Sequence, residues 1–286
     1  MKKQNYFKAA LFLLLTVLGT SFMAAGAKYA SSFASIHMIV AVQYGFGLVV
    51  LTPYFLRGGI KRLKTSHPGL HLLRGACGLL SFYTYYYAIQ EISLLEASLL
   101  RNSAPLCLPL MAMVCMRERI SGQRWLALII GFIGVAVILH PAPGALDAWY
   151  LAALVSAIFV ALSMLTTRLL VETETPKAVM FYYFFMAVPC SLPGAIINYE
   201  PLSLYQWVVL VLVALSFYLA LSLYTRSFQY AKATALAPFI YFGVVFAGIL
   251  GWIFWHQVPE PITYAGVVLV IGGALISARI DTGRGV

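Results

Sequence analysis

ASLLRNSAPLCLPL, the stretch from Ala97 to Leu110, lies within an apolar run at positions 94–116. A run of this length can cross the hydrocarbon core of a membrane as a helix, which needs about 20 residues. The stretch nevertheless contains Arg101, Asn102 and two prolines. Polar groups are costly at this depth unless they face the inside of a helix bundle or a watery cavity. The stretch therefore predicts a membrane helix that turns one polar face inward.

The composition of the whole chain also indicates a membrane protein. Of its 286 residues, 62% are hydrophobic and only 10% are charged. A soluble protein of this length needs a larger charged surface to stay in solution. The strands of a membrane barrel alternate apolar and polar residues over about ten positions, whereas the apolar runs here are continuous and longer. We therefore expect an all-α integral membrane protein.

Ten apolar runs are long enough to be transmembrane helices. They cover residues 8–27, 36–56, 71–90, 94–116, 124–140, 148–168, 178–197, 205–226, 233–254 and 262–279. The first run can also be interpreted as a cleavable signal peptide, because Lys2 and Lys3 precede it and the small residues Ala25-Gly26-Ala27 end it. We favour a retained span, since the internal repeat described below needs it.

The basic residues indicate how the spans are oriented. Seventeen of the nineteen lysines and arginines fall on one side of the membrane, Lys28 falls on the other, and Arg101 lies within a span. Lysine and arginine stay on the cytoplasmic side, so we expect both termini in the cytoplasm and the protein in a bacterial cytoplasmic (inner) membrane. The net charge of +10 then attracts anionic membrane lipid and predicts no nucleic-acid partner.

A weak repeat relates the two halves of the chain. When the sequence is shifted by 139 residues, Gly134 falls on Gly273, and the fourth and fifth runs overlay the ninth and tenth. Because each half has an odd number of spans, the second half must be inserted upside down. We predict two inverted five-helix repeats, residues 1–146 and 147–286. Such repeats are typical of secondary transporters, whose substrate site lies between the halves near the membrane midplane.

Two long stretches resemble the drug/metabolite transporter superfamily, in its EamA-type branch. They are YYAIQEISLLEASLLRNSAPLCLPLMAMVCMRERISGQRWLALIIGFIGVAVIL (Tyr86–Leu139) and FQYAKATALAPFIYFGVVFAGILGWIFWHQVPEPITYAGVVLVIGGALI (Phe228–Ile276). Each half in that family has two alanines and a proline, a glutamate after the fourth span and a glycine in the fifth. The first half matches this pattern at Ala88, Ala97, Pro105, Glu118 and Gly134.

The second half departs from the pattern, because Gln257 and Val244 stand where the family has the glutamate and the proline. The resemblance implies a ten-span fold and the transport of small molecules. It does not specify the substrate, since members move amino acids, nucleotide-like metabolites, drugs and organic acids.

The fourth span has one polar face. At 100° per residue, five of its residues share an arc of about 100°: Ser98, Arg101, Asn102, Pro105 and Pro109. Each proline removes a backbone hydrogen bond, so we expect Pro105 and Pro109 to kink the helix. In a cavity, Arg101 would bind a carboxylate or phosphate by a two-point contact. Its alternative role is structural, by snorkelling outward or by pairing with Glu91 or Glu96.

Aromatic residues of two other spans are expected to form the wall of the same cavity. Helical spacing places Tyr83 and Tyr86 on one face of the third span, and Tyr241 and Trp252 on one face of the ninth. The predicted substrate-binding residues are thus Arg101, Asn102, Ser98, Tyr83, Tyr86, Tyr241 and Trp252. Further candidates are Gln43, Tyr182, Tyr183 and Tyr224.

The sequence shows no catalytic or metal-binding pattern. The five histidines lie in loops or near span ends, and the four cysteines lie in apolar runs without the spacing of a metal site. No phosphate-binding glycine loop is present. We therefore expect no enzyme activity, no metal and no cofactor.

These patterns together predict a secondary transporter. It would move a small organic metabolite with a carboxylate or other anionic group by alternating access, with a coupling ion or a counter-substrate, as a monomer or a dimer. The alternative is an exporter of amphiphilic or cationic drugs and amino acids. A membrane-embedded lipid enzyme and a channel fit less well, because neither a polar catalytic cluster nor repeated polar rings are visible.

Overall fold

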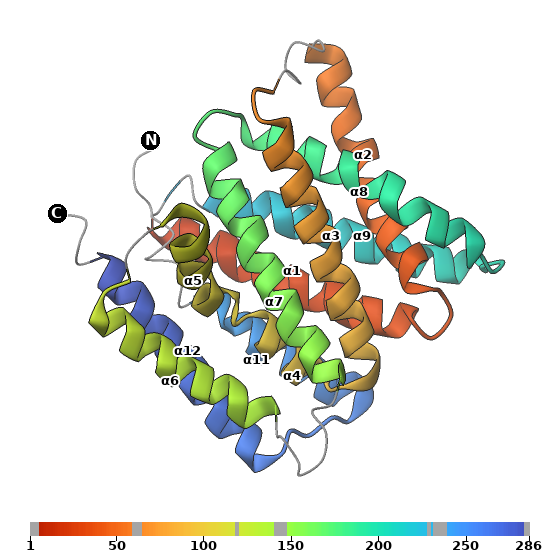
Figure 1. The fold of residues 1–286 in the computed structure, drawn as a ribbon. Coiled ribbons are helices and arrows are strands. Elements are labelled where there is room, and N and C mark those ends of the chain that lie inside the picture. The colour runs from red at the N-terminus through yellow and green to blue at the C-terminus, as the bar shows by residue number, and fades with distance from the viewer. Residues whose placement is uncertain are drawn as a thin grey trace.

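The computed structural model describes residues 6–58, 65–117, 120–139, 148–227, 230 and 239–282, and this part of the chain is helical without strands (Figure 1). Its helices are α1 (Tyr6–Ala30), α2 (Ile36–Gly58), α3 (Pro68–Glu91), α4 (Leu94–Arg101), α5 (Ala104–Met116), α6 (Gly122–Leu139), α7 (Ala148–Leu170), α8 (Pro176–Ile197), α9 (Leu204–Ser227), α11 (Phe242–Trp255) and α12 (Pro261–Thr282). Lys2, Lys3, Glu118, residues 233–238 and the boundary between the predicted repeats lie outside the described residues.

The described helices are those of an integral membrane protein. Six segments are long and apolar enough to cross a membrane, and α4 with α5 forms one of them, Leu94–Cys115. Shorter apolar helices occur at Gly122–Ile138, Phe242–Trp255 and Pro261–Ser277. The predicted all-helical membrane fold is therefore confirmed.

The helix pairs in contact follow a regular scheme. The most extensive contacts join α1 to α9, α3 to α7, α2 to α8 and α6 to α12, and α4 packs on α11. Figure 1 shows α6 and α12 side by side at one edge, away from α2 and α8. The ten spans can be numbered along the chain, with α4 and α5 together as the fourth and α11 as the ninth. If each span is exchanged with the span five places later, the pair α1–α9 becomes the pair α7–α3. The pairs α2–α8, α4–α11 and α6–α12 become themselves. This is the scheme expected of a two-fold repeat, although the inverted orientation of the halves stays a prediction.

One unusual backbone conformation occurs twice, at positions separated by the 139 residues of the predicted repeat. In the described part, the non-glycine residues with positive φ are Arg117 (φ 57°) and His256 (φ 53°), which end α5 and α11. They are 139 positions apart. Helices commonly end in this left-handed conformation, but glycine usually adopts it because a Cβ makes it costly. The same local geometry at equivalent places supports the repeat.

The predicted kink of the fourth span is a break between two helices. α4 ends at Arg101, Asn102 and Ser103 form a turn, and α5 begins at Ala104 with Pro105 in its first turn. Proline is tolerated there because the first turn has no intrahelical partner for its missing N–H. Pro109 lies inside α5. The interruption thus precedes both prolines instead of lying at them.

The ninth span is interrupted at the equivalent position. Tyr241, which is 139 positions after Asn102, is a turn residue between the helical residues 239–240 and α11. Broken helices are common near transporter substrate sites, because their ends expose backbone groups inside the membrane. The Asn102 side chain lies near Gly243, two residues after Tyr241, and α4 packs on α11, so the two breaks are close together.

Gln257 explains how the second half can depart from the family pattern. Its Oε1 accepts a hydrogen bond from the backbone N–H of Leu94, the first residue of α4, at 3.0 Å. The first N–H groups of a helix lack partners within the helix. A glutamine oxygen meets this need as a glutamate oxygen would.

Candidate functional site

Aromatic rings from four helices meet in the core of the protein. The ring of Tyr44 on α2 lies 5.2–6.0 Å from the ring centroids of its neighbours on α3, α8 and α9. We call this set the central aromatic cluster, and its members are Tyr44, Phe82, Tyr86, Tyr183, Phe184 and Phe217. All six rings are buried. Edge-to-face packing of this kind holds the rings rigidly against one another.

The cluster contains polar groups as well as rings. The Tyr44 hydroxyl donates to the Tyr183 hydroxyl at 2.8 Å, and the Tyr86 hydroxyl donates to Oε1 of Gln43. The other end of the Gln43 side chain, Nε2, is buried and has no partner among the described residues. A buried polar atom without a partner costs about 1–3 kcal/mol, so this atom is suited to hold a ligand or a water.

Arg101 lies beside the cluster at the end of α4. Its Cζ is 4.6 Å from the ring centroid of Phe82 and 4.8 Å from that of Tyr85. Its Nη1 donates to the carbonyl oxygen of Ser81 at 3.0 Å and to the Ser81 hydroxyl at 2.6 Å. Among the described residues, Nε and Nη2 of Arg101 make no hydrogen bond. The rings therefore fix the plane of the guanidinium and leave one of its edges available.

The carboxylates proposed as structural partners do not pair with Arg101. Glu96 accepts hydrogen bonds from Ser93, Tyr150 and Thr263 instead, and no ion pair joins Glu91 to Arg101 within the described residues. The electrostatic neighbours of Arg101 are tyrosines: Tyr85, Tyr183, Tyr86 and Tyr44. The sequence alternative of a structural ion pair is thus not realised, although Arg101 does fasten α4 to α3 through Ser81.

Arg74 is a buried arginine, and it is one of the seventeen basic residues that the sequence assigns to the cytoplasmic side. Its Cζ lies 4.6 Å from the ring centroid of Tyr183. Its Nε donates to the Thr167 hydroxyl at 2.6 Å, and its Nη1 donates to the carbonyl oxygen of Val179 at 3.0 Å. The sequence held a signal for this, since Arg74 falls inside the predicted span 71–90 and not in the preceding loop.

Of the remaining predicted residues, all but Trp252 are at least partly buried among the helices. The Ser98 hydroxyl is 2.8 Å from that of Tyr85, the Asn102 amide approaches Gly243 of α11, and Tyr241 is 4% exposed with its hydroxyl unpartnered in the described part. Tyr86 belongs to the cluster, and Tyr83 bonds to His37 at 2.9 Å. Trp252 is 60% exposed, and the structure does not bring it to these residues.

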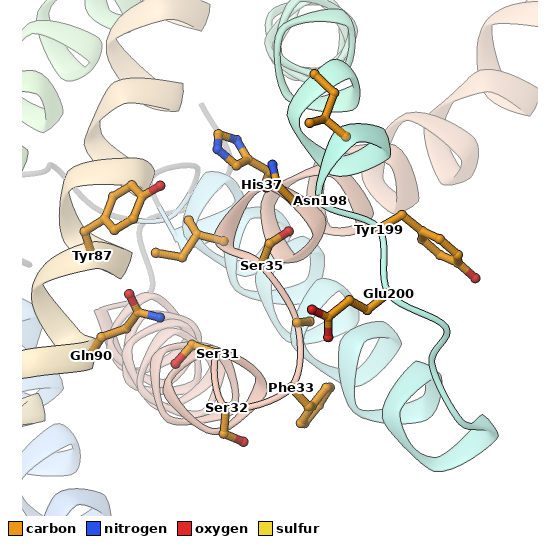
Figure 2. A pocket seen from close by; sticks show the side chains of 13 residues that line it. Ser31, Ser32, Phe33, Ser35, His37, Tyr87, Gln90, Asn198, Tyr199 and Glu200 are labelled. Carbon is orange, nitrogen blue, oxygen red and sulfur yellow. The ribbon is translucent and has the colours of Figure 1, made fainter.

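A pocket of about 690 Å³ opens at one end of α2, α3 and α8 (Figure 2). Its lining includes His37 of α2, Tyr87 and Gln90 of α3, and Asn198 and Glu200 after α8. The hydrogen bond between His37 and Tyr83 links this pocket to α3 at greater depth. The volume is in the range of small-molecule sites, and the lining is mostly polar.

A family model for the EamA-like transporter family matches residues 7–140 and again residues 147–279. The chain belongs to this family. The protein is therefore a transporter and not an enzyme. The two matched segments correspond to the two halves that the sequence shift relates.

Curated relatives and a solved structure extend the comparison. The chain is 28% identical to the pseudopaline exporter CntI of Pseudomonas aeruginosa over 95% of this chain and 97% of that one. It is 26% identical to an S-adenosylmethionine uptake transporter of Rickettsia bellii (92% and 91% covered) and 26% identical to a riboflavin transporter of Brucella anthropi (84% and 87%). A structure described as "Crystal structure of protein" has the same fold, with TM-score 0.64, 19% identity, and 97% and 99% coverage.

Proposed function

We propose that the protein is a secondary transporter of a small organic metabolite that carries a carboxylate or another anionic group. The observation that supports this most directly is the position of Arg101. Its guanidinium is stacked on Phe82 and Tyr85 and has no carboxylate partner among the described residues. A charge inside a membrane protein costs at least ~2.5–3.5 kcal/mol on insertion scales. A substrate anion would offset this cost.

The geometry suits an anion better than a cation. An arginine can present two N–H groups to the two oxygens of a carboxylate, and the unused Nε and Nη2 atoms of Arg101 form such an edge. Gln43, whose Oε1 accepts from Tyr86 of the central aromatic cluster, and Tyr241 also have a polar atom without a partner in the described part, and these atoms would hold further polar atoms of the substrate. Ser98 and Asn102 lie on the same broken span and complete the proposed site.

The aromatic cluster supports a substrate with an organic body. Flat rings at fixed positions bind ring systems and apolar groups. Two of the relatives are named for S-adenosylmethionine and riboflavin, and both of these compounds contain aromatic rings. The rival proposal, an exporter of cationic drugs, would require an acidic group near the rings, and the electrostatic neighbours of Arg101 and Arg74 in the described part are tyrosines.

Transport would proceed by alternating access between two predicted inverted repeats, residues 1–146 and 147–286. We place the protein in a bacterial inner membrane with both termini in the cytoplasm, from the distribution of basic residues. Movement would be coupled to an ion or to a counter-substrate.

A solute screen followed by counterflow tests the proposed substrate class. Amino acids, carboxylates and nucleotide-like metabolites would first be ranked by the rise in melting temperature of the detergent-solubilised protein. The best carboxylate and its neutral amide would then be compared as labelled solutes in proteoliposomes. We expect saturable exchange of the carboxylate and little of the amide. Equal exchange of both would contradict anion recognition and leave only the transporter fold.

A further inference from the structure

A buried hydrogen bond between a histidine and a glutamate joins the two halves of the chain at one end of α3. Nε2 of His71 lies 2.6 Å from Oε2 of Glu174, in the turn between α7 and α8, and the two side chains are 1% and 6% exposed. The Thr65 hydroxyl, just before α3, donates to the other carboxylate oxygen. The ring of Tyr182 covers the His71 ring, with centroids 4.3 Å apart. The His71 and Glu174 side chains are therefore shielded from solvent.

One turn further along α3, Arg74 reinforces the same interface. Its guanidinium donates to Thr167 of α7 and to the carbonyl oxygen of Val179 on α8. His71 and Arg74 are three residues apart and thus lie on one face of the helix. Both side chains therefore hold α3 against the α7–α8 pair of the other half.

The opposite end of α3 is open. There, Tyr87 and Gln90 form one side of the 690 Å³ pocket, and the end of α8 with Asn198 forms another. Figure 2 shows Tyr87 and Gln90 on one side of the space and His37, Asn198 and Tyr199 across from them. α3 and α8 thus meet through Arg74 and Val179 at one end and line a pocket at the other.

We propose that the His71–Glu174 pair is the latch of an inner gate, which must open for the transporter to reach its opposite state. The inference rests on the alternating-access part of the proposed function. A carrier needs one end closed while the other is open, and this interface has that arrangement. Arg74 is the second contact of the gate. By the predicted topology, the latch faces the cytoplasm and the pocket faces outward.

The chemistry of the pair suits a contact that forms and breaks. Removing one partner of a buried hydrogen bond leaves the other partner buried and unsatisfied, whereas replacing both partners by groups of the same shape can be nearly neutral. The second ring nitrogen of His71, Nδ1, is buried without a partner in the described part, so the closed state does not satisfy every polar atom at the latch. Opening would allow water to reach this nitrogen, which offsets part of the loss of the His71–Glu174 hydrogen bond.

Thiol labelling at the pocket measures the state of the gate without any substrate. The reporter is Gln90→Cys, a pocket residue, in a background in which Cys77, Cys107, Cys115 and Cys190 are replaced. A membrane-impermeant maleimide would be applied to intact cells and to inside-out vesicles. The latch variants are His71→Gln, Glu174→Gln and the double variant. The matched controls are His67→Gln and Glu172→Gln, which are exposed neighbours of the latch residues.

If the latch holds the observed state, each latch variant will slow labelling of Gln90→Cys severalfold, and the controls will label at the parent rate. The double variant will resemble the single variants, because all three lack the same contact. Detergent melting curves identify variants that fail to fold, and for these Glu174→Asp serves as the milder change.

Unchanged labelling in folded latch variants would overturn the proposal. If these variants also melt at a lower temperature, the contact only stabilises the fold. Labelling of the parent only in inside-out vesicles, from the cytoplasmic face, would contradict the predicted orientation and not the latch. Since no solute is present, these outcomes are independent of whether Arg101 binds an anion.

Discussion

The Tyr44 hydroxyl donates a hydrogen bond to the Tyr183 hydroxyl at 2.8 Å, and these residues are 139 positions apart. This is the distance by which the two halves of the sequence overlay. A residue that touches its own equivalent lies on the axis of a two-fold repeat. For the predicted two-fold repeat, the axis would pass through the central aromatic cluster, beside Arg74 and Arg101, and the proposed site would lie between the halves.

Glycines at equivalent positions should hold the last spans of the two halves together. A Cβ on Gly134 would lie 2.7 Å from Val270 N, and one on Gly273 would lie 2.6 Å from the carbonyl oxygen of Ala127. We expect Gly134→Ala and Gly273→Ala each to destabilise the protein by about 1–3 kcal/mol, the usual cost of overpacking, with a lower melting temperature in detergent. Gly272→Ala is the control, since a Cβ there meets nothing within 4 Å. Equal melting of all three variants would contradict the close packing of α6 on α12.

The Tyr241 hydroxyl should serve transport and not stability. It is buried without a partner in the described part of the chain, so Tyr241→Phe removes an unsatisfied group and should leave the melting temperature unchanged or slightly higher. Initial uptake should fall if a substrate atom pairs with this hydroxyl. Tyr264→Phe is an exposed control. A variant that is less stable but transports normally would show that the hydroxyl has a structural role only.

Trp252 should not contribute to binding. It is exposed on α11 together with Phe242, Val245 and Ile249, which share one face at helical spacing. We expect this face to contact lipid. Trp252→Ala should therefore leave unchanged the substrate concentration that gives half-maximal exchange. Tyr86→Ala should raise this concentration, because it weakens binding. A large loss of substrate affinity in Trp252→Ala would support the prediction from the sequence that Trp252 binds the substrate.

The orientation of the protein in the membrane can be measured by the accessibility of single cysteines in its loops and at its helix ends. Single cysteines in place of Glu172 and Arg226 are expected to react with an impermeant maleimide only in inside-out vesicles, and Ser32→Cys only in intact cells. All three positions lie outside the apolar parts of the helices. The reversed pattern would overturn the inference from the basic residues.

The sequence predicts the number and the approximate limits of the helices because membrane spans need long apolar runs, which are local features. It also identifies the polar face of the fourth span, where Ser98, Arg101 and Asn102 lie. Proline is the local signal for a kink, so the sequence predicts the distortion at Pro105 and Pro109. The structure places the turn before Pro105, at a position also interrupted in the ninth span.

Contacts between distant segments could not be predicted in this way. His71 and Glu174 are 103 residues apart, and no pattern in the sequence indicates that these two residues form a pair. Helical spacing placed Tyr241 and Trp252 on related faces, but spacing alone does not say which face meets lipid in a chain whose helices are apolar all round. The contacts of Arg74 with α7 and α8 could not be predicted for a similar reason, since a basic residue near a span end is ordinarily interpreted only as a topology signal.

The central claim, that Arg101 recognises an anionic substrate, is tested most directly by binding of the carboxylate identified in the solute screen to Arg101→Gln and Arg101→Lys. The change in melting temperature of each apo protein is measured on the same preparations. We predict that Arg101→Gln folds and loses about 1.5–3 kcal/mol of binding, which is roughly tenfold or more in affinity. Arg101→Lys should recover part of it, since lysine keeps the charge but not the planar pair of donors. The exposed Arg226→Gln should bind as the parent does. Unchanged carboxylate binding by a stable Arg101→Gln protein would contradict the account.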